Sequence, residues 1–233
     1  IILPSISYQE TLCTHFGVDY KKICVIPNCF EPMIKKISFS SRIKKGALVY
    51  CGRLAPEKNL LLLLRAFQII HQKYSFSYLT LIGGGPMLQE LKDYAFKLGI
   101  AQSVFFTGQV PHEKVFEYLS QGKIFVSTSL SEIHPLTLLE AMHIGLVPVT
   151  FDSPGLKDTI VHAKQGWIVK DRTEEEYARA VIKLISSPKT LNKLSIQAKQ
   201  RSRDYFPSNI VPLIMNLYNQ AIEEKEREEN YAP

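Results

Sequence analysis

Two glutamates in this chain have the type and spacing to hold a phosphorylated ligand. Glu132 and Glu140 stand on either side of an expected helix start, with seven residues between them, and the helix covers residues 135–144. The helical rise places Glu140 roughly 7 to 8 Å beyond the first helical residue, so the two carboxylates could hold different parts of one extended ligand. The first amides of this helix, at Leu136 and Thr137, are unpaired and favour an anion, particularly phosphate.

A strand, a loop, a helix and a second strand position these glutamates. Residues 124–126 form a short apolar run, Pro135 suits the first helical position, Gly145 ends the helix, and residues 147–150 form the next strand. Units of this order build parallel sheets. Their loops lie at the carboxyl ends of the strands, where open α/β sheets bind ligands.

Two basic residues occupy a second loop of the same kind, residues 52–58, between a buried strand and a helix. Arg53 offers a planar fork to phosphate oxygens, and Lys58 offers a compact point charge. Together with the start of the helix at Pro135, they could hold a diphosphate without a metal. Taken alone, each would more commonly be an ordinary surface charge.

A glycine run and a histidine are further candidates with weaker individual signals. Gly83, Gly84 and Gly85 lie between a strand and a helix, where missing side chains allow a ligand to approach the backbone, although a tight turn is the alternative. The run matches neither a Walker loop nor the G-x-G-x-x-G fingerprint. His134 is the only histidine in the loop that carries Glu132, and it could contact a ligand or be structural.

The regular alternation of elements defines the fold class. Strands are expected at residues 47–51, 78–82, 104–107, 124–126, 147–151 and 166–169, with helices between them and two more helices at 191–203 and 209–228. Asn59 is expected to cap one helix, and Thr173 with Glu176 forms a capping box for another. This order predicts an α/β fold with a doubly wound parallel sheet.

Composition narrows the class of protein. The chain is 45% hydrophobic and 21% charged, as in soluble globular proteins, and no apolar run is long enough to cross a bilayer. Its net charge of +6 could match nucleic acid, an anionic membrane or a phosphorylated ligand, but no interleaved basic and aromatic residues support nucleic acid. The four cysteines have no metal or redox spacing, which favours reduced thiols in an intracellular protein.

Four motifs occur in one order: G-R-L-x-x-E-K-N, I-G-G-G-P, F-T-G-Q-V and S-E-x-x-P-L-T-L-L-E-A-M. Their joint pattern, over about residues 47–185, resembles the retaining glycosyltransferases of the GT-B fold with the E-x7-E motif, the glycosyl transferases group 1. The resemblance implies a Rossmann-like carboxyl-terminal domain that binds a nucleotide sugar. It implies no cofactor besides this donor substrate and no metal.

The resemblance also implies a role for each matching residue. Arg53 and Lys58 would bind the diphosphate and stabilise it as a leaving group. Glu132 would contact the donor sugar and Glu140 the ribose hydroxyls. The remaining binding positions would be the cleft-lining Gly83, Gly84 and Gly85, the backbone of Val110 at the base, His134, and the amides of Leu136 and Thr137 at the phosphates. Relatives commonly carry Gly-Phe where Ile133-His134 stands here, which leaves the sugar open.

The resemblance divides the chain into four parts. Residues 1–34 would be a remnant of an amino-terminal domain, 35–46 a basic linker, 47–206 the nucleotide-sugar-binding domain, and 207–233 a helix returning toward the amino-terminal domain. Because the chain begins with Ile rather than Met, it is interpreted as a fragment whose acceptor site lies in the missing domain.

The expected activity is transfer of a hexose from a nucleotide diphosphate sugar, UDP-linked, to a glycan or lipid acceptor with retention. The fragment alone is expected to bind the donor without turnover. The expected location is the cytoplasm, with contact at the cytoplasmic face of a membrane as an option. Two alternatives remain: a non-catalytic module that binds a nucleotide sugar, and a sugar-nucleotide epimerase.

Overall fold

The structure is a computed structural model that describes residues 1–32 and 46–230, with side chains up to Arg227. Apart from Gly46, the expected basic linker of residues 35–46 lies outside the described residues.

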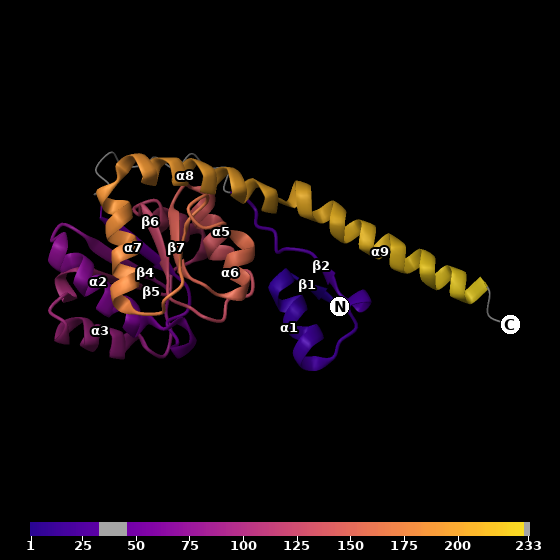
Figure 1. The fold of residues 1–233 in the computed structure, drawn as a ribbon, viewed down its shortest axis with the longest axis horizontal. Coiled ribbons are helices and arrows are strands. Elements are labelled where there is room, and N and C mark those ends of the chain that lie inside the picture. The colour runs from indigo at the N-terminus through magenta and orange to yellow at the C-terminus, as the bar shows by residue number, and fades with distance from the viewer. Residues whose placement is uncertain (33–45, 231–233) are drawn as a thin grey trace.

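Six parallel strands form the central sheet, in the order β5-β4-β3-β6-β7-β8. Figure 1 shows this sheet with helices packed around it. Their bounds are β3 (Ala47–Cys51), β4 (Tyr78–Ile82), β5 (Val104–Gly108), β6 (Ile124–Ser127), β7 (Val147–Phe151) and β8 (Trp167–Val169). The chain builds one half of the sheet outward from β3 and then returns to build the other half outward from β6. The strand order therefore reverses between β3 and β6, and open sheets of this type bind ligands at that reversal.

Helices cover both faces of the sheet, which confirms the predicted doubly wound α/β class. The helices on one face are α2 (Leu60–Lys73), α3 (Leu88–Lys97) and α7 (Glu174–Ser186). Those on the other are α4 (His112–Leu119), α5 (Leu136–His143) and α6 (Pro154–Thr159). The helix α8 (Pro188–Ser202) runs past the ends of the sheet and contacts α5 and α7. This arrangement gives the sheet a separate apolar core on each face.

The strand β3 shows why the sheet needs helices on both sides. Alternate side chains of a strand point to opposite faces. Leu48 and Tyr50 accordingly pack in the core on the α2 side, while Val49 and Cys51 pack in the core on the α5 side. Every residue of β3 is buried, as expected for a central parallel strand.

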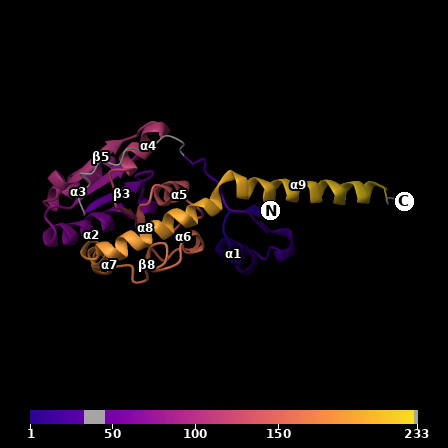
Figure 2. The same ribbon diagram turned by 90° about the horizontal axis from the view of Figure 1, so that it is seen from above.

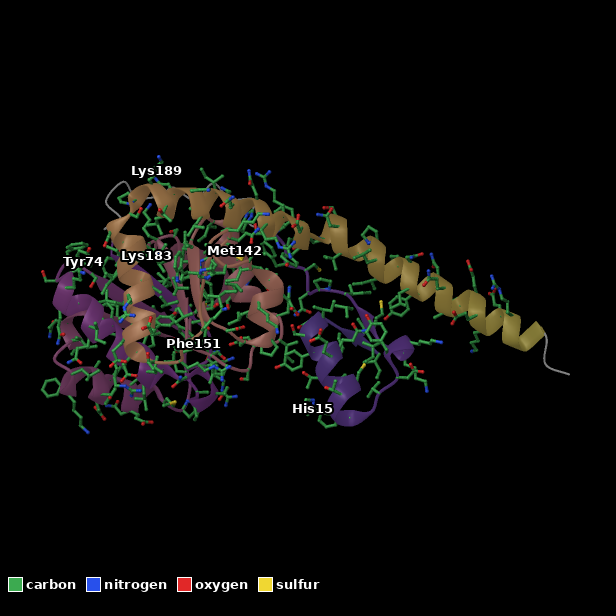
Figure 3. The ribbon with its side chains drawn as sticks, viewed as in Figure 1. His15, Tyr74, Met142, Phe151, Lys183 and Lys189 are labelled. Carbon is green, nitrogen blue, oxygen red and sulfur yellow. The ribbon has the colours of Figure 1, made fainter. Side chains whose placement is uncertain are left out.

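The second half of the sheet is packed in the same way. Phe151 of β7 and Met142 of α5 lie inside the body of the protein, whereas Lys189 at the start of α8 lies on its surface (Figure 3).

Two expected helix caps are each confirmed in part: Asn59 occupies the N-cap position of α2 and Thr173 that of α7. Asn59 precedes α2 in a left-handed conformation, with φ of 53°, and its side chain makes no capping hydrogen bond. Asn59 ends a tight turn that begins at Pro56, since its amide donates to the Pro56 carbonyl at 3.0 Å. Thr173 does cap α7, because its hydroxyl accepts from the Glu176 amide at 3.3 Å. The Glu176 carboxylate pairs with Arg179 instead of completing the capping box.

The first residues form β1 (Ile2–Leu3), α1 (Ile6–Phe16) and β2 (Cys24–Val25), a small unit beside α6. Asp158 on α6 caps α1 from outside, since its carboxylate accepts from the Ser7 amide at 2.9 Å and from the hydroxyls of Ser5 and Ser7 at 2.5 and 2.6 Å. The Phe30 amide also donates to the Tyr205 carbonyl at 3.2 Å. The segment just after β2 is thus joined to the segment just before α9, although the two lie far apart in the sequence.

The last helix, α9 (Pro207–Asn230), leads away from the body of the protein (Figures 1 and 2). Ile210 is buried at its base, whereas Leu213, Tyr218 and Ile222 are exposed. The return of residues 207–233 toward another domain stays a prediction. Within the described part of the chain, no helix combines the length and apolarity needed to cross a membrane.

Candidate functional site

An ion pair connects the two loops at the point where the strand order reverses. Lys58 follows β3 and Glu132 follows β6, and the Lys58 Nζ lies 2.7 Å from the Glu132 Oε1. Both side chains are about one-fifth exposed, so solvent or a ligand can reach the pair. The structure therefore brings together two predicted residues that are 74 positions apart in the chain.

The loop that carries Lys58 is held by the loop after β6. The Thr128 hydroxyl lies 3.0 Å from the carbonyls of both Lys58 and Asn59. This is the role that sequence reasoning missed for Asn59: its carbonyl, not its side chain, makes the local contact. The fixed backbone limits how far Lys58 can move from Glu132.

The loop that carries Glu132 rests on the helix α6. The Gly155 amide donates to the Glu132 carbonyl at 3.1 Å. A Cβ at Gly155 would lie 1.8 Å from the Ile133 carbonyl oxygen, far inside van der Waals contact. The close approach explains why a glycine occupies this position, and the contact holds the Glu132 loop against α6.

Arg53 lies on the same loop as Lys58 but is held differently. Its side chain is exposed, while its carbonyl accepts a hydrogen bond from the Tyr50 hydroxyl at 2.9 Å. Burial, followed by the nearby Glu132 carboxylate, raises the pKa of Tyr50, so its hydroxyl remains a donor. Arg53 thus has an anchored backbone and a side chain directed to solvent.

The glycine run after β4 packs against this same loop. A Cβ at Gly83 would lie 2.1 Å from the Gly52 carbonyl oxygen, and one at Gly85 would lie 2.3 Å from the Leu54 carbonyl oxygen. Gly83 also has a φ of 129°, which side chains rarely adopt. The absence of side chains at these two positions thus serves contact between neighbouring loops. A Cβ at Gly84 would only touch Gln109 at 3.4 Å.

The helix α5 begins at Leu136, one residue later than predicted, and Pro135 occupies the N-cap position. Its fixed φ of −74° is compatible with either place. The Leu138 amide is bonded to the Pro135 carbonyl at 3.1 Å. The amides of Leu136 and Thr137 have no helical acceptor one turn earlier and no other hydrogen-bond partner among residues 1–32 and 46–230, so they are open to an anion.

Glu140 is buried on α5, and His112 is its partner. The His112 Nε2 lies 2.8 Å from the Glu140 Oε1, while the Glu140 Oε2 is buried without a hydrogen-bond partner among the described residues. Burial raises the pKa of Glu140, and His112 opposes that rise. Burial, followed by the Glu140 charge, raises the pKa of the Cys51 thiol to about 12. Cys51 ends β3, so Glu140 belongs to the same edge of the sheet as Lys58.

His112 was missed in the sequence because no motif marked it. It lies two residues after Val110, which packs against the core on the α5 side, at the start of the helix that follows β5. The available signal was position alone: the carboxyl end of β5 reaches the same sheet edge as β3 and β6.

His134 faces a different environment from the carboxylates. Its ring lies 5.0 Å from the Tyr205 ring, and its carbonyl accepts from the Asn28 side chain at 3.0 Å. Burial lowers the pKa of His134 to about 4, with Asp158 opposing and Arg201 adding to the shift. The neutral side chain of His134 thus belongs to the contact of the Glu132 loop with the segment after β2, at Asn28, and with the segment before α9, at Tyr205.

Metal ligands are not grouped in the part of the chain that the structure describes: no three side chains of His, Cys, Asp or Glu are placed to hold an ion together. Metal independence remains a prediction. All four cysteines are free.

The fold and the site together define a doubly wound α/β protein with basic, acidic and helix-start groups at its strand-order reversal. The chain belongs to the family of glycosyl transferases group 1, whose family model matches residues 33–201.

Two curated relatives illustrate the match. An uncharacterized glycosyltransferase of Haemophilus influenzae is 28% identical over 186 residues, which cover 79% of this chain and 51% of that protein. A GDP-mannose-dependent alpha-(1-6)-phosphatidylinositol monomannoside mannosyltransferase of Mycolicibacterium smegmatis is 25% identical over 195 residues, covering 81% of this chain and 50% of that protein. The chain thus spans about half the length of these curated relatives.

A solved structure shares the fold. HepE of Anabaena, crystallised with UDP and glucose, has a TM-score of 0.81 and 20% sequence identity over 94% of this chain and 62% of that one. The likeness confirms the Rossmann-like domain of a GT-B glycosyltransferase as the fold of this chain.

Proposed function

We propose that this chain is the donor-binding part of a glycosyltransferase that moves a hexose from a UDP-linked sugar to a glycan or lipid acceptor. The observation that carries the proposal is the convergence at one sheet edge of Lys58, Glu132, the start of α5 and Glu140. The first three bring opposite charges and open amides to one place. The fourth contributes a buried carboxylate with a free oxygen.

The parts of the donor follow from these charges. Lys58, Arg53 and the amides of Leu136 and Thr137 bind the diphosphate, which is the most anionic portion of the ligand. Glu132, which is partly exposed, accepts hydroxyls of the sugar. Glu140 accepts the ribose hydroxyls, the backbone at Val110 meets the base, and the glycines at 83–85 let the nucleotide lie close to the loops.

These groups suit transfer with retention and without a metal. The bond from the anomeric carbon to the diphosphate breaks, and an acceptor hydroxyl bonds to the same face of the sugar and gives its proton to the departing diphosphate. Negative charge grows on the leaving group as the bond breaks. Preorganised cations and amides stabilise that charge directly, and the two glutamates orient the sugar for attack.

The acceptor and the location belong to the whole protein and are proposed with it. The Mycolicibacterium smegmatis relative carries phosphatidylinositol in its name, which supports a lipid acceptor and work at the cytoplasmic face of a membrane. The net charge of +6 suits an anionic surface. Sedimentation of the chain with anionic but not neutral vesicles is the expected result.

Calorimetric titration tests the donor site. The 233-residue chain is titrated with UDP, GDP and UDP-glucose in the presence of a chelator, and the Arg53→Ala and Glu140→Ala variants are compared with the unchanged chain. Saturable binding of UDP that both substitutions weaken supports the proposal. Preference for GDP moves the donor to the GDP-sugars, and absence of any nucleotide binding contradicts the proposal.

A further inference from the structure

His112 and Glu140 form a pair in which the exposed partner holds the buried one. The two side chains are 2.8 Å apart, and their exposed fractions are 73% for His112 and 7% for Glu140. His112 is the first residue of α4, and its one ring contact within the described part of the chain is with the edge of Phe116, at 6.2 Å between ring centres. Apolar packing therefore does not explain where this side chain lies. Its one polar partner among the described residues is Glu140.

The pairing leaves the Glu140 carboxylate half satisfied. An ionised carboxylate accepts several hydrogen bonds through both oxygens. Here the Oε1 accepts from His112, while the Oε2 is buried and accepts from none of the described residues. A buried acceptor without a donor is costly, and native proteins rarely keep one. The free oxygen therefore calls for a donor that the described chain does not supply.

The position of the pair indicates where that donor comes from. His112 arrives from the end of β5 and Glu140 from the helix after β6, so they approach the strand-order reversal from its two sides. Open sheets of this type bind ligands at the reversal, close to both elements. Hydroxyl groups are neutral donors of the right kind for the free carboxylate oxygen.

We infer that His112 is a positioning residue, which holds one oxygen of Glu140 so that the other accepts the ribose hydroxyls of the bound nucleotide. The inference rests on the proposed function and adds a residue to its site. His112 does not itself touch the ligand. Without its hydrogen bond, the carboxylate can rotate, and its free oxygen no longer has one fixed direction.

A ribose-specific comparison tests this role. The 233-residue chain is titrated with whichever of UDP and GDP binds more tightly and with the 2′,3′-dideoxy form of that nucleotide. His112→Ala should weaken the ribonucleotide about tenfold, as loss of a hydrogen bond to a charged group predicts, and should hardly change the dideoxy form. His112→Gln should restore most of the affinity, because its amide can donate from nearly the same place.

Lys114→Ala is the matched control. Lys114 is an exposed residue on the first turn of the same helix, so its removal takes away a positive charge without touching Glu140. Unchanged binding in this variant shows that the effect of His112 is not one of general charge. Equal weakening in both variants would overturn the positioning role.

Other results overturn the inference while sparing the proposed function. If His112→Ala binds as the unchanged chain does while Glu140→Ala binds weakly, His112 is a bystander. If His112→Ala binds more tightly, the histidine covers Glu140 and competes with the ligand. If ribonucleotide and dideoxynucleotide weaken equally, the effect does not pass through the ribose. Failure of the unchanged chain to bind either nucleotide removes the proposed function and the inference together.

Discussion

In one short segment, from the Glu132 loop through α5, the glutamates and the histidines have different surroundings. Its two glutamates face the sheet edge and have charged or polar partners, Lys58 and His112. Its two histidines, His134 and His143, face aromatic rings of the segments just after β2 and just before α9. The glutamates thus pair with polar side chains near the strand-order reversal, whereas the histidines pack against aromatic rings.

The difference is visible in the surroundings of the histidines. The His143 ring packs against both Phe30 and Phe206, with ring centres 5.6 and 5.4 Å away. Burial, followed by Lys199 and Arg203, lowers the pKa of His143. His134 packs on Tyr205 in the same manner. Residue type and loop position alone therefore do not mark a ligand contact. Within one motif, some residues can lie at the candidate site while their neighbours pack against the rest of the protein.

The largest expected effect comes from the contact that supports Glu132. Gly155→Ala would place a methyl group 1.8 Å from the Ile133 carbonyl oxygen, so the loop or α6 must shift. We expect a loss of more than about 3 kcal/mol in the free energy of unfolding, measured by urea denaturation. Gly84→Ala is the control, since its Cβ meets only an ordinary contact at 3.4 Å, and should cost less than about 1 kcal/mol. Similar losses in both would show that the loop is not fixed by α6.

The histidine side should respond to acid. The pKa of His134 falls from 6.5 to about 4 on folding, so the unfolded chain binds the proton first as the pH is lowered through that range. Its share of stability is present above pH 6.5 and is lost toward pH 4, by up to about 3 kcal/mol, and His143 acts in the same direction.

Urea denaturation of a His134→Phe variant at pH 7 and pH 4.5 checks this sign. The difference in unfolding free energy between the two pH values should be smaller than in the unchanged chain. His15→Gln, at an exposed site on α1, should leave that difference as it is. A pH dependence that His134→Phe does not reduce would place the acid sensitivity elsewhere.

The two glutamates can be separated by their ligands. Lys58→Met should weaken UDP about tenfold through loss of a cation at the diphosphate. Glu132→Gln should leave UDP binding nearly unchanged but remove any added affinity for UDP-glucose, because this residue is assigned to the sugar. Calorimetry with both ligands decides the matter. Weakening of UDP by Glu132→Gln would instead mean that the ion pair is needed to hold Lys58 in place.

The smallest effect is expected at Glu140, where a substitution should raise stability and weaken nucleotide binding. Burial raises the pKa of this carboxyl, so its ionised form is disfavoured in the folded chain and stability falls as the pH rises above the usual range of a glutamate. Glu140→Gln should therefore raise the free energy of unfolding at pH 7 by about 1 kcal/mol while weakening nucleotide binding. Glu117→Gln, exposed on α4, should change neither. A less stable Glu140→Gln variant would show that the pair with His112 outweighs the burial.

Local pattern was enough to predict most of the fold. Apolar runs of strand length, such as Ala47–Cys51 and Tyr78–Ile82, are found as predicted, because the central strands of a parallel sheet are buried on both faces and need continuous apolar sequence. Pro135 and Gly145, residues that favour the start and the end of a helix, predicted both ends of α5 to within one residue. The left-handed conformation of Asn59 was not predicted, because the expected cap did not take account of the tight turn that ends there.

The site was predictable only in part. The strand–loop–helix order placed Lys58 and Glu132 at one edge, because parallel strands bring their carboxyl ends together. The 2.7 Å contact itself depends on strands β3 and β6 being neighbours. Neither the bond from His112 to Glu140 nor the packing of His134 on Tyr205 has a local signature, since each joins residues far apart in the chain.

The sequence by itself determined the α/β class, the positions of its strands and the loops that carry charge, because these depend on periodicity and on single residues such as proline and glycine. Only the tertiary structure decided the strand order, the partner of each charged group and the face on which each histidine lies. Contacts between loops are set by which strands become neighbours, and that choice is made by the packing of the whole core. The glutamates of this chain thus acquire their separate environments only when the sheet is assembled.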